Sequence, residues 1–344
     1  MEGISRRGLI AKTGALAGSA AMASSVFADS AFGAQGATTP LSDFSHLKGK
    51  SVGHIVIDIT ATFPTRSSAE AQRLGKKYGF DVQIVDGAGD YNKLNQALTT
   101  FATKKVDAIL NTGCDPSLLK SGLSAAASAN IPVGCMVAGY GPGVLYDVEV
   151  NDWLSYARLG TYIYNRLGTG GDWGAAIINW SNVPALRIRS AQIKAMFKYN
   201  KTPILAEEEV KVPGFVPDAK QKAAALLTKY PKGGKLKVIV AGWDDVGIAA
   251  AQAIQEAGRK DVFVVSADGN LAAFDMIRAN KPFAVTCSGD VEGMADVMYG
   301  QMSAILGGAK PLATTLYVDA PMITKRNVPP KGKYPRGAGL TLYT

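Results

Sequence analysis

Aromatic, carboxylate and guanidinium side chains recur in this 344-residue chain where apolar, strand-like runs end. A carboxylate accepts hydrogen bonds from two hydroxyl groups, an arginine donates through a planar fork, and an aromatic ring covers an apolar C–H face. This mixture predicts a site for a small, uncharged, hydroxyl-bearing molecule. The candidate residues that follow these strand-like runs are Phe63, Asn111, Tyr140, Trp180, Arg189, Phe215, Trp243, Asp244, Asp268 and Ser288.

Each of these residues also has a plain structural interpretation. A Trp at a strand end can pack against the rim of a domain, and Asp268-Gly269 can form a turn. Their convergence on strand ends favours the binding site, but the structural interpretation stays open for each residue taken singly.

Catalytic, metal and nucleotide sites receive little support. His46 and His54 are the two histidines, and no Cys/His cluster has the spacing of metal ligands. The chain has no Gly-x-Ser-x-Gly motif, no Ser–His–Asp set and no phosphate-binding Gly-Lys-Ser/Thr. Gly139–Gly143 is similar to a dinucleotide loop, but Pro142 opposes the helix N-terminus that such a loop needs. We therefore expect no enzyme, no cofactor and no metal.

Strand-like and helix-like segments alternate from Ser51 onward. The first two are an apolar, β-branched run at Val52–Ile59 and a helical pattern at Ser67–Tyr78. Continuous Val/Ile strands that alternate with helices indicate parallel sheets covered on both faces. Two strand–loop–helix units, 106–115 and 236–245, echo each other, so the sequence predicts an α/β fold with two doubly wound, Rossmann-like lobes. Ligands of such sheets bind beyond the carboxyl ends of the strands, where two facing lobes form a cleft.

Residues 1–34 have the composition of an export signal. The basic pattern Ser-Arg-Arg-x-Leu-Ile-x-Lys precedes a weakly apolar Ala/Gly/Ser segment, and small residues offer cleavage after Ala28 or Ala34. The pattern resembles a twin-arginine signal, and a disordered, Ala-rich tail is the alternative. The sequence thus predicts a protein that is exported from the cytoplasm and is soluble after cleavage.

The rest of the chain suits a soluble protein of two domains. About 310 residues follow the leader, more than one core usually holds, and no run of about 18 apolar residues occurs among them. The net charge is +9, but the Lys and Arg pairs are scattered at the ends of expected helices, so we expect no nucleic acid partner. Cys114, Cys135 and Cys287 lie in or beside apolar strands and are expected to be core residues of a monomer.

Several segments, in their order and spacing, resemble the periplasmic sugar-binding proteins of the ribose/galactose type. These proteins have the type I periplasmic binding fold and are the ligand receptors of ABC importers. The resemblance covers roughly Lys50 to Val328. The segments that carry it are Ile131-Pro132-Val133, Asn151-Asp152, Val264–Gly269 and Val318–Val328.

The resemblance implies two lobes joined by a multi-strand hinge, and a membrane permease of an ABC importer as partner. It implies that Phe63 stacks on the ligand and that Arg189 and Asp268 hydrogen-bond to its hydroxyl groups. It adds Asp152, at the first expected crossing between the lobes, to the ligand-binding set. The first lobe then comprises residues 45–150 and 290–319, and the second lobe comprises residues 151–289 and 320–344.

Several positions depart from the pattern of the resembled family. Charged residues that are common after the fourth strand are replaced by Val137-Ala138, and an Asn is replaced by Trp243. A polar residue near the last crossing is replaced by Ser288-Gly289, and an Asp-Asn pair is reversed as Asn151-Asp152. These changes favour a polyol, a deoxy or modified sugar, or a non-sugar cyclic ligand over a standard aldopyranose.

The leading hypothesis is a periplasmic receptor that captures one small sugar, polyol or related cyclic ligand and delivers it to an ABC permease. An exported sensor for chemotaxis or signalling has the same build. A repressor core would need an amino-terminal helix-turn-helix, for which residues 35–50 are too few. An exported glycosidase-like enzyme could use Asp244 and Asp268 as acid and base, but it lacks a nucleophile. For the receptor, Asp268→Ala or Arg189→Ala is expected to abolish ligand-induced thermal stabilisation without unfolding the protein.

Overall fold

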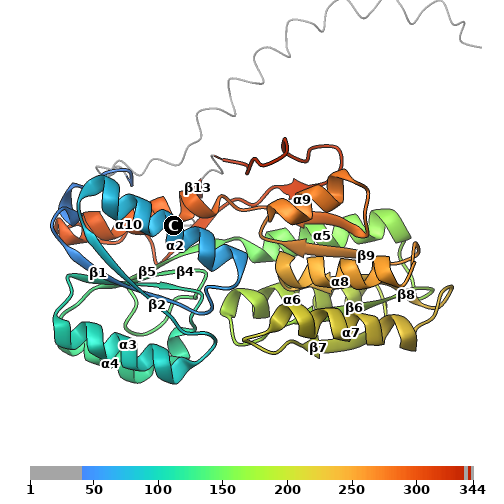
Figure 1. Ribbon diagram of the computed structural model, residues 1–344, viewed down its shortest axis with the longest axis horizontal. Coiled ribbons are helices and arrows are strands. Elements are labelled where there is room, and N and C mark those ends of the chain that lie inside the picture. Colours follow the sequence, from blue (N-terminus) through green and yellow to red (C-terminus); the bar gives the residue numbers. More distant parts are fainter. Residues whose placement is uncertain (1–40, 337–339, 342–344) are drawn as a thin grey trace, which may run out of the picture. The chain divides into compact units, whose positions relative to one another are not determined.

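Apolar, β-branched runs form two sheets, each covered by helices on both faces (Figure 1). The computed structural model describes residues 41–336 and 340–341, and the expected export signal lies outside these residues. The strands of the first sheet are β1 (Ser51–Val56), β2 (Asp81–Asp86), β3 (Ala108–Thr112), β4 (Val133–Met136), β5 (Tyr146–Val150), β11 (Thr315–Val318) and β13 (Leu340–Thr341). The strands of the second sheet are β6 (Gly174–Asn179), β7 (Ile204–Glu209), β8 (Leu236–Ala241), β9 (Phe263–Ala267), β10 (Phe283–Cys287) and β12 (Met322–Ile323).

The two sheets repeat one topology. The first has the order β13-β11-β5-β4-β3-β1-β2 and the second has the order β12-β10-β9-β8-β6-β7. In both, the first strand of the lobe lies between the second and the third, and the fourth and fifth follow outward. All pairs are parallel except β11 with β13 and β10 with β12. The predicted α/β fold of two doubly wound lobes is confirmed.

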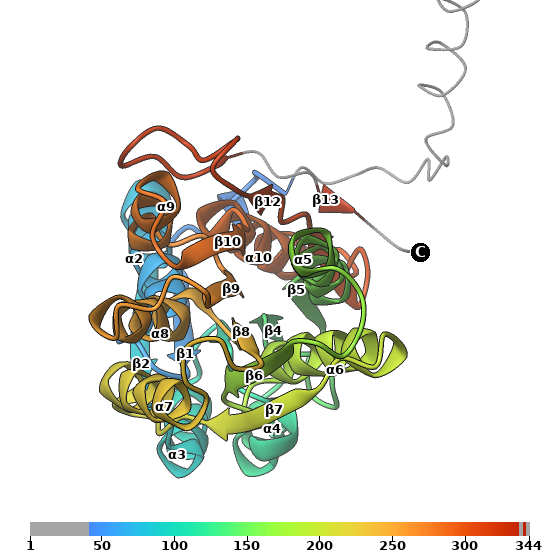
Figure 2. The same cartoon turned by 90° about the vertical axis from the view of Figure 1, so that its right-hand side faces the viewer.

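Helices cover both faces of each sheet because each crossover between parallel strands must pass over one face. On the first sheet, α2 and α10 lie on one face and α3 and α4 on the other (Figure 1). On the second, α5 and α6 lie opposite α7 and α8 (Figure 2). The helices are η1 (Ser45–Leu47), α2 (Thr62–Tyr78), α3 (Tyr91–Lys104), η2 (Pro116–Leu118), α4 (Lys120–Ser128), α5 (Asp152–Leu167), α6 (Pro184–Tyr199), α7 (Phe215–Lys229), α8 (Asp244–Glu256), α9 (Leu271–Arg278) and α10 (Val291–Leu306). No helix in the described part of the chain is long and apolar enough to cross a membrane.

The chain passes between the sheets at several points. It leaves the first sheet after β5, returns after β10 to place α10 on the first sheet, and leaves again between β11 and β12. The end of the chain departs from the expectation that residues 320–344 belong to the second lobe. Leu340–Thr341 forms β13 and pairs with β11 of the first sheet. The outer edge of β11 offers unpaired backbone groups, and an extended tail can satisfy them.

Candidate functional site

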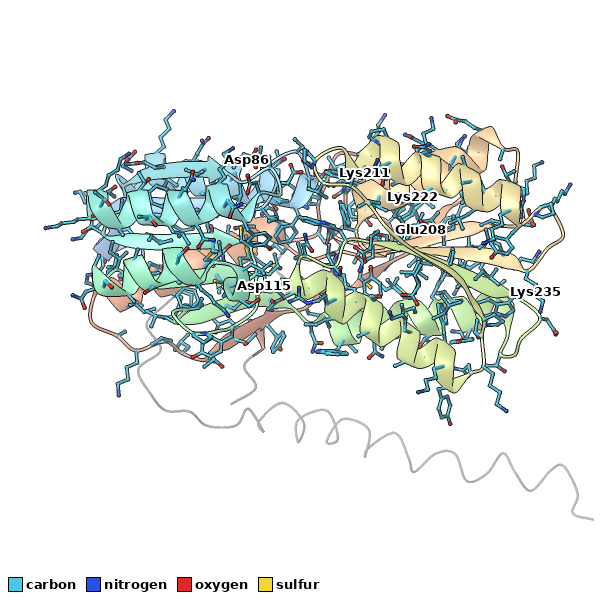
Figure 3. The ribbon with its side chains drawn as sticks, turned by 90° about the horizontal axis from the view of Figure 1, so that it is seen from below. Asp86, Asp115, Glu208, Lys211, Lys222 and Lys235 are labelled. Carbon is cyan, nitrogen blue, oxygen red and sulfur yellow. The ribbon has the colours of Figure 1, made fainter. Side chains whose placement is uncertain are left out.

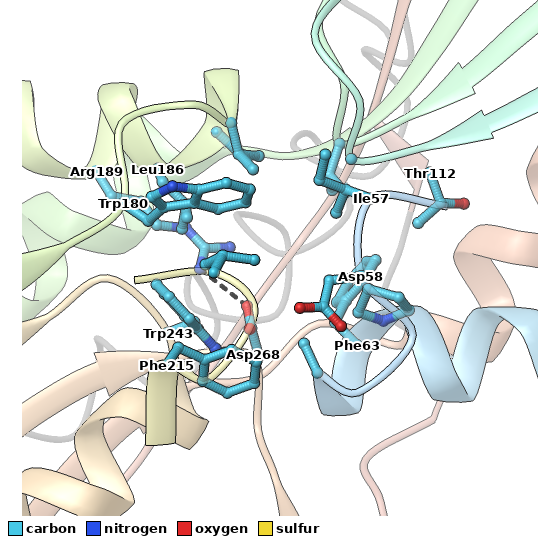
Figure 4. A pocket seen from close by; sticks show the side chains of 17 residues that line it. Ile57, Asp58, Phe63, Thr112, Trp180, Leu186, Arg189, Phe215, Trp243 and Asp268 are labelled. Atoms are coloured by element: carbon cyan, nitrogen blue, oxygen red, sulfur yellow. Dashed lines mark ion pairs between the residues drawn. The ribbon is translucent and has the colours of Figure 1, made fainter. Parts of the chain in front are cut away.

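A cavity of about 80 Å³ lies between the two lobes, beyond the carboxyl ends of the strands (Figure 4). One water needs roughly 10–15 Å³ of such space, so the cavity suits a single small molecule. From the first lobe it is lined by Ile57, Asp58, Ala61, Phe63, Pro64, Thr112, Gly113 and Val137. From the second lobe it is lined by Trp180, Val183, Ala185, Leu186, Arg189, Val212, Phe215, Trp243 and Asp268.

The first-lobe wall is formed where β1 and β4 end. β1 ends at Val56, so Ile57 and Asp58 follow directly, and Phe63 stands in the first turn of α2. Val137 follows β4 and has a φ of 51°. The left-handed region is unfavourable for a β-branched residue, at a cost of roughly 1–3 kcal/mol. The surrounding structure therefore holds an apolar side chain against the cavity in a strained conformation.

The second-lobe wall is largely aromatic. Trp180 follows β6, Phe215 is the first residue of α7, and Trp243 lies between β8 and α8. The rings of Phe215 and Trp243 meet edge to face, with centroids 5.3 Å apart and planes at 62°. This arrangement is favourable for aromatic pairs and fixes both rings at the cavity.

Arg189 is the central charged group of the site and is only 4% exposed. Its Nε donates to Asp152 Oδ1 at 2.8 Å, and its Nη1 donates to the Gly242 carbonyl at 2.8 Å. Nη1 also lies 2.9 Å from Asp268 Oδ1 (Figure 4). One guanidinium is thus shared by two buried carboxylates and orients Asp268 at the cavity.

The electrostatics of the site are dominated by burial. Burial raises the pKa of Asp268 to about 6, the nearby Arg189 charge opposes the shift, and Asp152 adds to it. Burial likewise raises the pKa of Asp152, against the effect of Arg189. Two cavity-lining groups, Asp58 Oδ2 and Trp243 Nε1, are buried without a hydrogen-bond partner among the described residues. An unsatisfied buried polar group is costly, so both atoms are candidates for contact with a ligand.

Six of the residues singled out from the sequence line this cavity. The others do not line it. The six are Phe63, Trp180, Arg189, Phe215, Trp243 and Asp268.

Asp244 and Asp152 hold the residues that line the cavity. Asp244 accepts hydrogen bonds from the backbone N–H groups of Gly269 and Asn270, both at 2.8 Å, and from the Thr286 hydroxyl at 2.9 Å. Burial raises its pKa well above the ordinary value. Asp152 is 1% exposed and is held by Arg189. Both carboxylates therefore position the Asp268 turn and the guanidinium from behind.

Asn111, Tyr140 and Ser288 are placed elsewhere. Asn111 is buried, where its Oδ1 accepts from the Cys114 N–H and its Nδ2 donates to the Cys114 carbonyl. Tyr140 is 55% exposed on a loop. Ser288 is buried at a lobe crossing, where its N–H donates to the Pro321 carbonyl at 3.0 Å. These side chains shape loops and the hinge and do not reach the cavity.

Asp58 and the aliphatic lining residues were not selected from the sequence. The expected strand Val52–Ile59 runs past the observed end of β1, so Asp58 was counted inside the strand. Its acidic side chain at the end of an apolar run was an available signal. Leu186 and Val212, in contrast, have no sequence feature that separates them from core residues.

Direct contacts join the two lobes around the cavity. Asp245 of α8 accepts from the N–H and the hydroxyl of Thr62, at the start of α2, at 2.9 and 2.6 Å. Arg187 of α6 pairs with Asp115 at 2.6 Å, on the side of the first lobe that faces the second (Figure 3). These contacts hold the lobes together over the cavity.

A cavity lined by both of two repeated α/β lobes is the arrangement of a two-lobed binding protein. Residues 52–310 match the family described as periplasmic binding protein domain, and the chain belongs to this family. Within residues 41–336 and 340–341, no group of three or more His, Cys, Asp or Glu residues could hold a metal ion.

Named relatives and solved structures agree with this assignment. The chain is 27% identical over 258 residues to the fructose import binding protein FruE of Bifidobacterium longum, covering 66% of this chain and 71% of that protein. An ABC transporter solute-binding protein from Agrobacterium vitis with bound allitol superimposes with a TM-score of 0.75 and 25% identity, covering 82% and 97% of the two chains. An ABC sugar transporter subunit from Rhodobacter sphaeroides superimposes with a TM-score of 0.74 and 23% identity, covering 82% of this chain and 100% of that chain. This similarity supports the fold.

Proposed function

We propose that the protein is the substrate-binding component of an ABC importer and captures one small sugar, polyol or related cyclic ligand between its lobes. The observation that carries the proposal is the cavity between the lobes, where Arg189 and Asp268 present a charged pair beside aromatic rings. Carboxylate and guanidinium groups suit ligand hydroxyls, and rings suit the C–H faces between them. FruE and the allitol-bound protein support this ligand class.

In this proposal the ligand binds by closing the lobes. Phe63 contacts it from the first lobe, and Trp180, Arg189, Phe215, Trp243 and Asp268 contact it from the second. Because only the closed form touches the ligand from both sides, binding shifts the population toward closure. The lobes are assigned as 45–150 plus 290–319 and 151–289 plus about 320–336, with the end of the tail returned to the first sheet.

The remaining parts of the proposal concern the location and the partners. Residues 1–34 direct export through the twin-arginine route, and the mature monomer works in the periplasm, where its closed form docks on the transmembrane permease. The protein itself catalyses no reaction.

The proposal is tested by a thermal-shift screen of the protein without residues 1–34 against fructose, allitol, inositols and pentoses. A ligand present at 100 times its Kd is expected to stabilise the protein by about 2.7 kcal/mol. Small-angle scattering with the best ligand should report a smaller radius of gyration than without it. The proposal fails if no sugar or polyol raises Tm and none changes the scattering curve.

A further inference from the structure

The cavity carries more negative than positive charge. Asp58 and Asp268 line it, Asp152 stands directly behind, and Arg189 is the cationic side chain of the lining. Arg189 is already shared between Asp152 and Asp268. Asp58 has no ion-pair partner among the described residues. A neutral ligand would leave this imbalance in place.

Asp58 is a buried carboxylate with one oxygen that lacks a hydrogen-bond partner among the described residues. It is 2% exposed, and its Oδ1 accepts from the N–H and the hydroxyl of Thr60 at 2.9 and 2.6 Å. Its Oδ2 has no partner within the described part of the chain. In Figure 4 the carboxylates of Asp58 and Asp268 point toward one another across the cavity, one from each lobe. A buried carboxylate is strongly destabilising unless a positive or hydrogen-bonding group meets it.

The walls around these carboxylates suit a cation as well as an apolar body. Phe63, Trp180, Phe215 and Trp243 contribute four aromatic rings to the lining. Aromatic faces attract ammonium groups, and the attraction grows when the cation is desolvated. Trp243 Nε1 is an unpartnered donor, so it calls for an acceptor such as a ligand oxygen.

We propose that the ligand of this site is a hydroxylated amine, an amino sugar or amino polyol, whose protonated nitrogen binds between Asp58 and Asp268. Its hydroxyl oxygens accept from Arg189 and from Trp243 Nε1, and its C–H faces lie on the aromatic and aliphatic walls. The inference rests on the proposed function, because the ammonium reaches both carboxylates when the lobes are closed. It replaces the uncharged ligand that the sequence alone suggested. The raised pKa of Asp268, caused by burial, agrees with a shortage of positive charge.

The experiment is calorimetric titration of the protein with matched pairs that share a skeleton and differ in one amine. Suitable pairs are glucosamine and glucose, 1-amino-1-deoxysorbitol and sorbitol, and 3-amino-1,2-propanediol and glycerol. At pH 7 the amine of at least one pair is expected to bind about tenfold more tightly than its neutral partner, because a charge-assisted contact replaces a neutral one. In Asp58→Asn, this preference should fall below about threefold.

Equal or weaker binding of the amine in every pair overturns the inference, and the proposed function then stands on the neutral partners that bind. Binding by no member of any pair also overturns the inference, whereas the proposed function is overturned only if the thermal-shift screen finds no ligand. A second measurement needs no ligand. Asp58→Asn keeps the acceptor for Thr60 and removes the unpaired charge, so its Tm should rise by about 2 °C or more. Asp107→Asn, which breaks a pair with Lys50, should lower Tm and serves as the control. An unchanged or lower Tm of Asp58→Asn overturns the inference.

Discussion

Arg189 and Asp268 form a buried ion pair at the cavity wall, with 2.9 Å between Arg189 Nη1 and Asp268 Oδ1. The same guanidinium holds Asp152 through Nε at 2.8 Å and the Gly242 carbonyl through Nη1. Arg189 is therefore a structural hub of the second lobe as well as a group that can touch a ligand. Asp268 stands at the end of this network, and its removal leaves the Asp152 contact intact.

This asymmetry predicts that Arg189→Ala loses more stability than a substitution of Asp268. Removing Arg189 strands two buried carboxylates, and breaking a buried pair in this way costs about 3–5 kcal/mol. Urea unfolding of Arg189→Ala should show a loss of this size. Asp268→Asn keeps the side-chain shape and should lose much less stability, so it is the better variant for binding tests. A loss below about 1 kcal/mol in Arg189→Ala would contradict the assigned hub role.

Asp268 should make the protein less stable as the pH rises. Burial raises its pKa from 3.8 to about 6, so between these values the folded state binds more protons than the unfolded state. The stability it contributes is present at low pH and is lost as pH rises through 6, at roughly 1.4 kcal/mol per pH unit, or about 3 kcal/mol in all. Unfolding free energies at pH 4 to 7 should fall more steeply with pH in the unmodified protein than in Asp268→Asn.

Asp107 provides a control, because its pKa is shifted in the opposite direction. Burial alone would raise the pKa of Asp107. The hydrogen bonds from the Ser51 N–H and from Lys50 together lower it by more, so the net shift is downward. Asp107→Asn should therefore leave the slope between pH 4 and 7 nearly unchanged and alter it, in the opposite direction, below the ordinary pKa of 3.8. Parallel pH profiles for the unmodified protein and Asp268→Asn would show that Asp268 titrates normally.

His54 should make the protein more stable as the pH rises, which is the opposite of the effect of Asp268 in a similar pH range. Burial lowers its pKa from 6.5 to about 4, and the neutral ring lies between the Tyr299 hydroxyl at 3.0 Å and the Thr112 hydroxyl at 2.9 Å. The stability that the neutral His54 ring contributes is fully present above pH 6.5. It decreases by about 3 kcal/mol as the pH falls toward 4. His54→Gln should unfold with a flatter acid limb, as measured by urea titration at pH 4 to 7. An unchanged acid limb would rule out a buried neutral imidazole.

The fold could be predicted from the sequence because its signals are local and redundant. Strands such as β8 and β9 contain uninterrupted Val and Ile residues at their centres, and each is followed by an Ala-rich or apolar helix. Periodicity alone therefore gives the layer arrangement, and the echo of residues 106–115 in 236–245 gives the repeated topology. The pairing of β13 with β11 could not be predicted, because a two-residue strand has no periodicity and its partner is set by the tertiary fold.

The site could be predicted only in part. A residue that follows a strand stands at the correct edge of the sheet, but its position does not tell whether the side chain points into the cleft or back toward a neighbouring loop. Asp268 points into the cavity, whereas Asp244 points back and holds the Asp268 turn. Asp58 was missed because the end of β1 was placed three residues late. Boundary errors of a few residues matter little for a fold and decide the membership of a site.

Tryptophan fluorescence should report the ligand. Trp180 and Trp243 line the cavity, whereas Trp153 is 48% exposed and Trp173 packs with Tyr164 and Phe197. Titration with any ligand from the thermal screen should change the emission, and Trp243→Phe should reduce that change by about half or more, because a cavity ring is removed. Trp153→Phe should keep the full change. Loss of the signal in Trp153→Phe instead would place the ligand elsewhere.

The contacts that join the lobes should set the affinity without touching the ligand. Asp115 and Arg187 come from different lobes and pair at 2.6 Å, and the Asp115 side chain is 8% exposed. Because the pair bridges the lobes, it stabilises the closed form in the proposed function and therefore favours binding. Asp115→Asn should weaken binding about tenfold, the equivalent of one charge-assisted hydrogen bond of roughly 1.5 kcal/mol. Calorimetry measures the affinity, and scattering of the ligand-free protein should show a larger radius of gyration.

A double-mutant cycle separates this effect from simple destabilisation. Asp115→Asn and Arg187→Gln should each weaken binding, and the double variant should bind no worse than either single variant, because both remove the same contact. Asp261→Asn breaks a pair with Arg259 inside the second lobe, so it should lower Tm and leave the affinity unchanged. Additive losses in the cycle, or an equal loss in Asp261→Asn, would mean that the Asp115–Arg187 pair has no special part in closure.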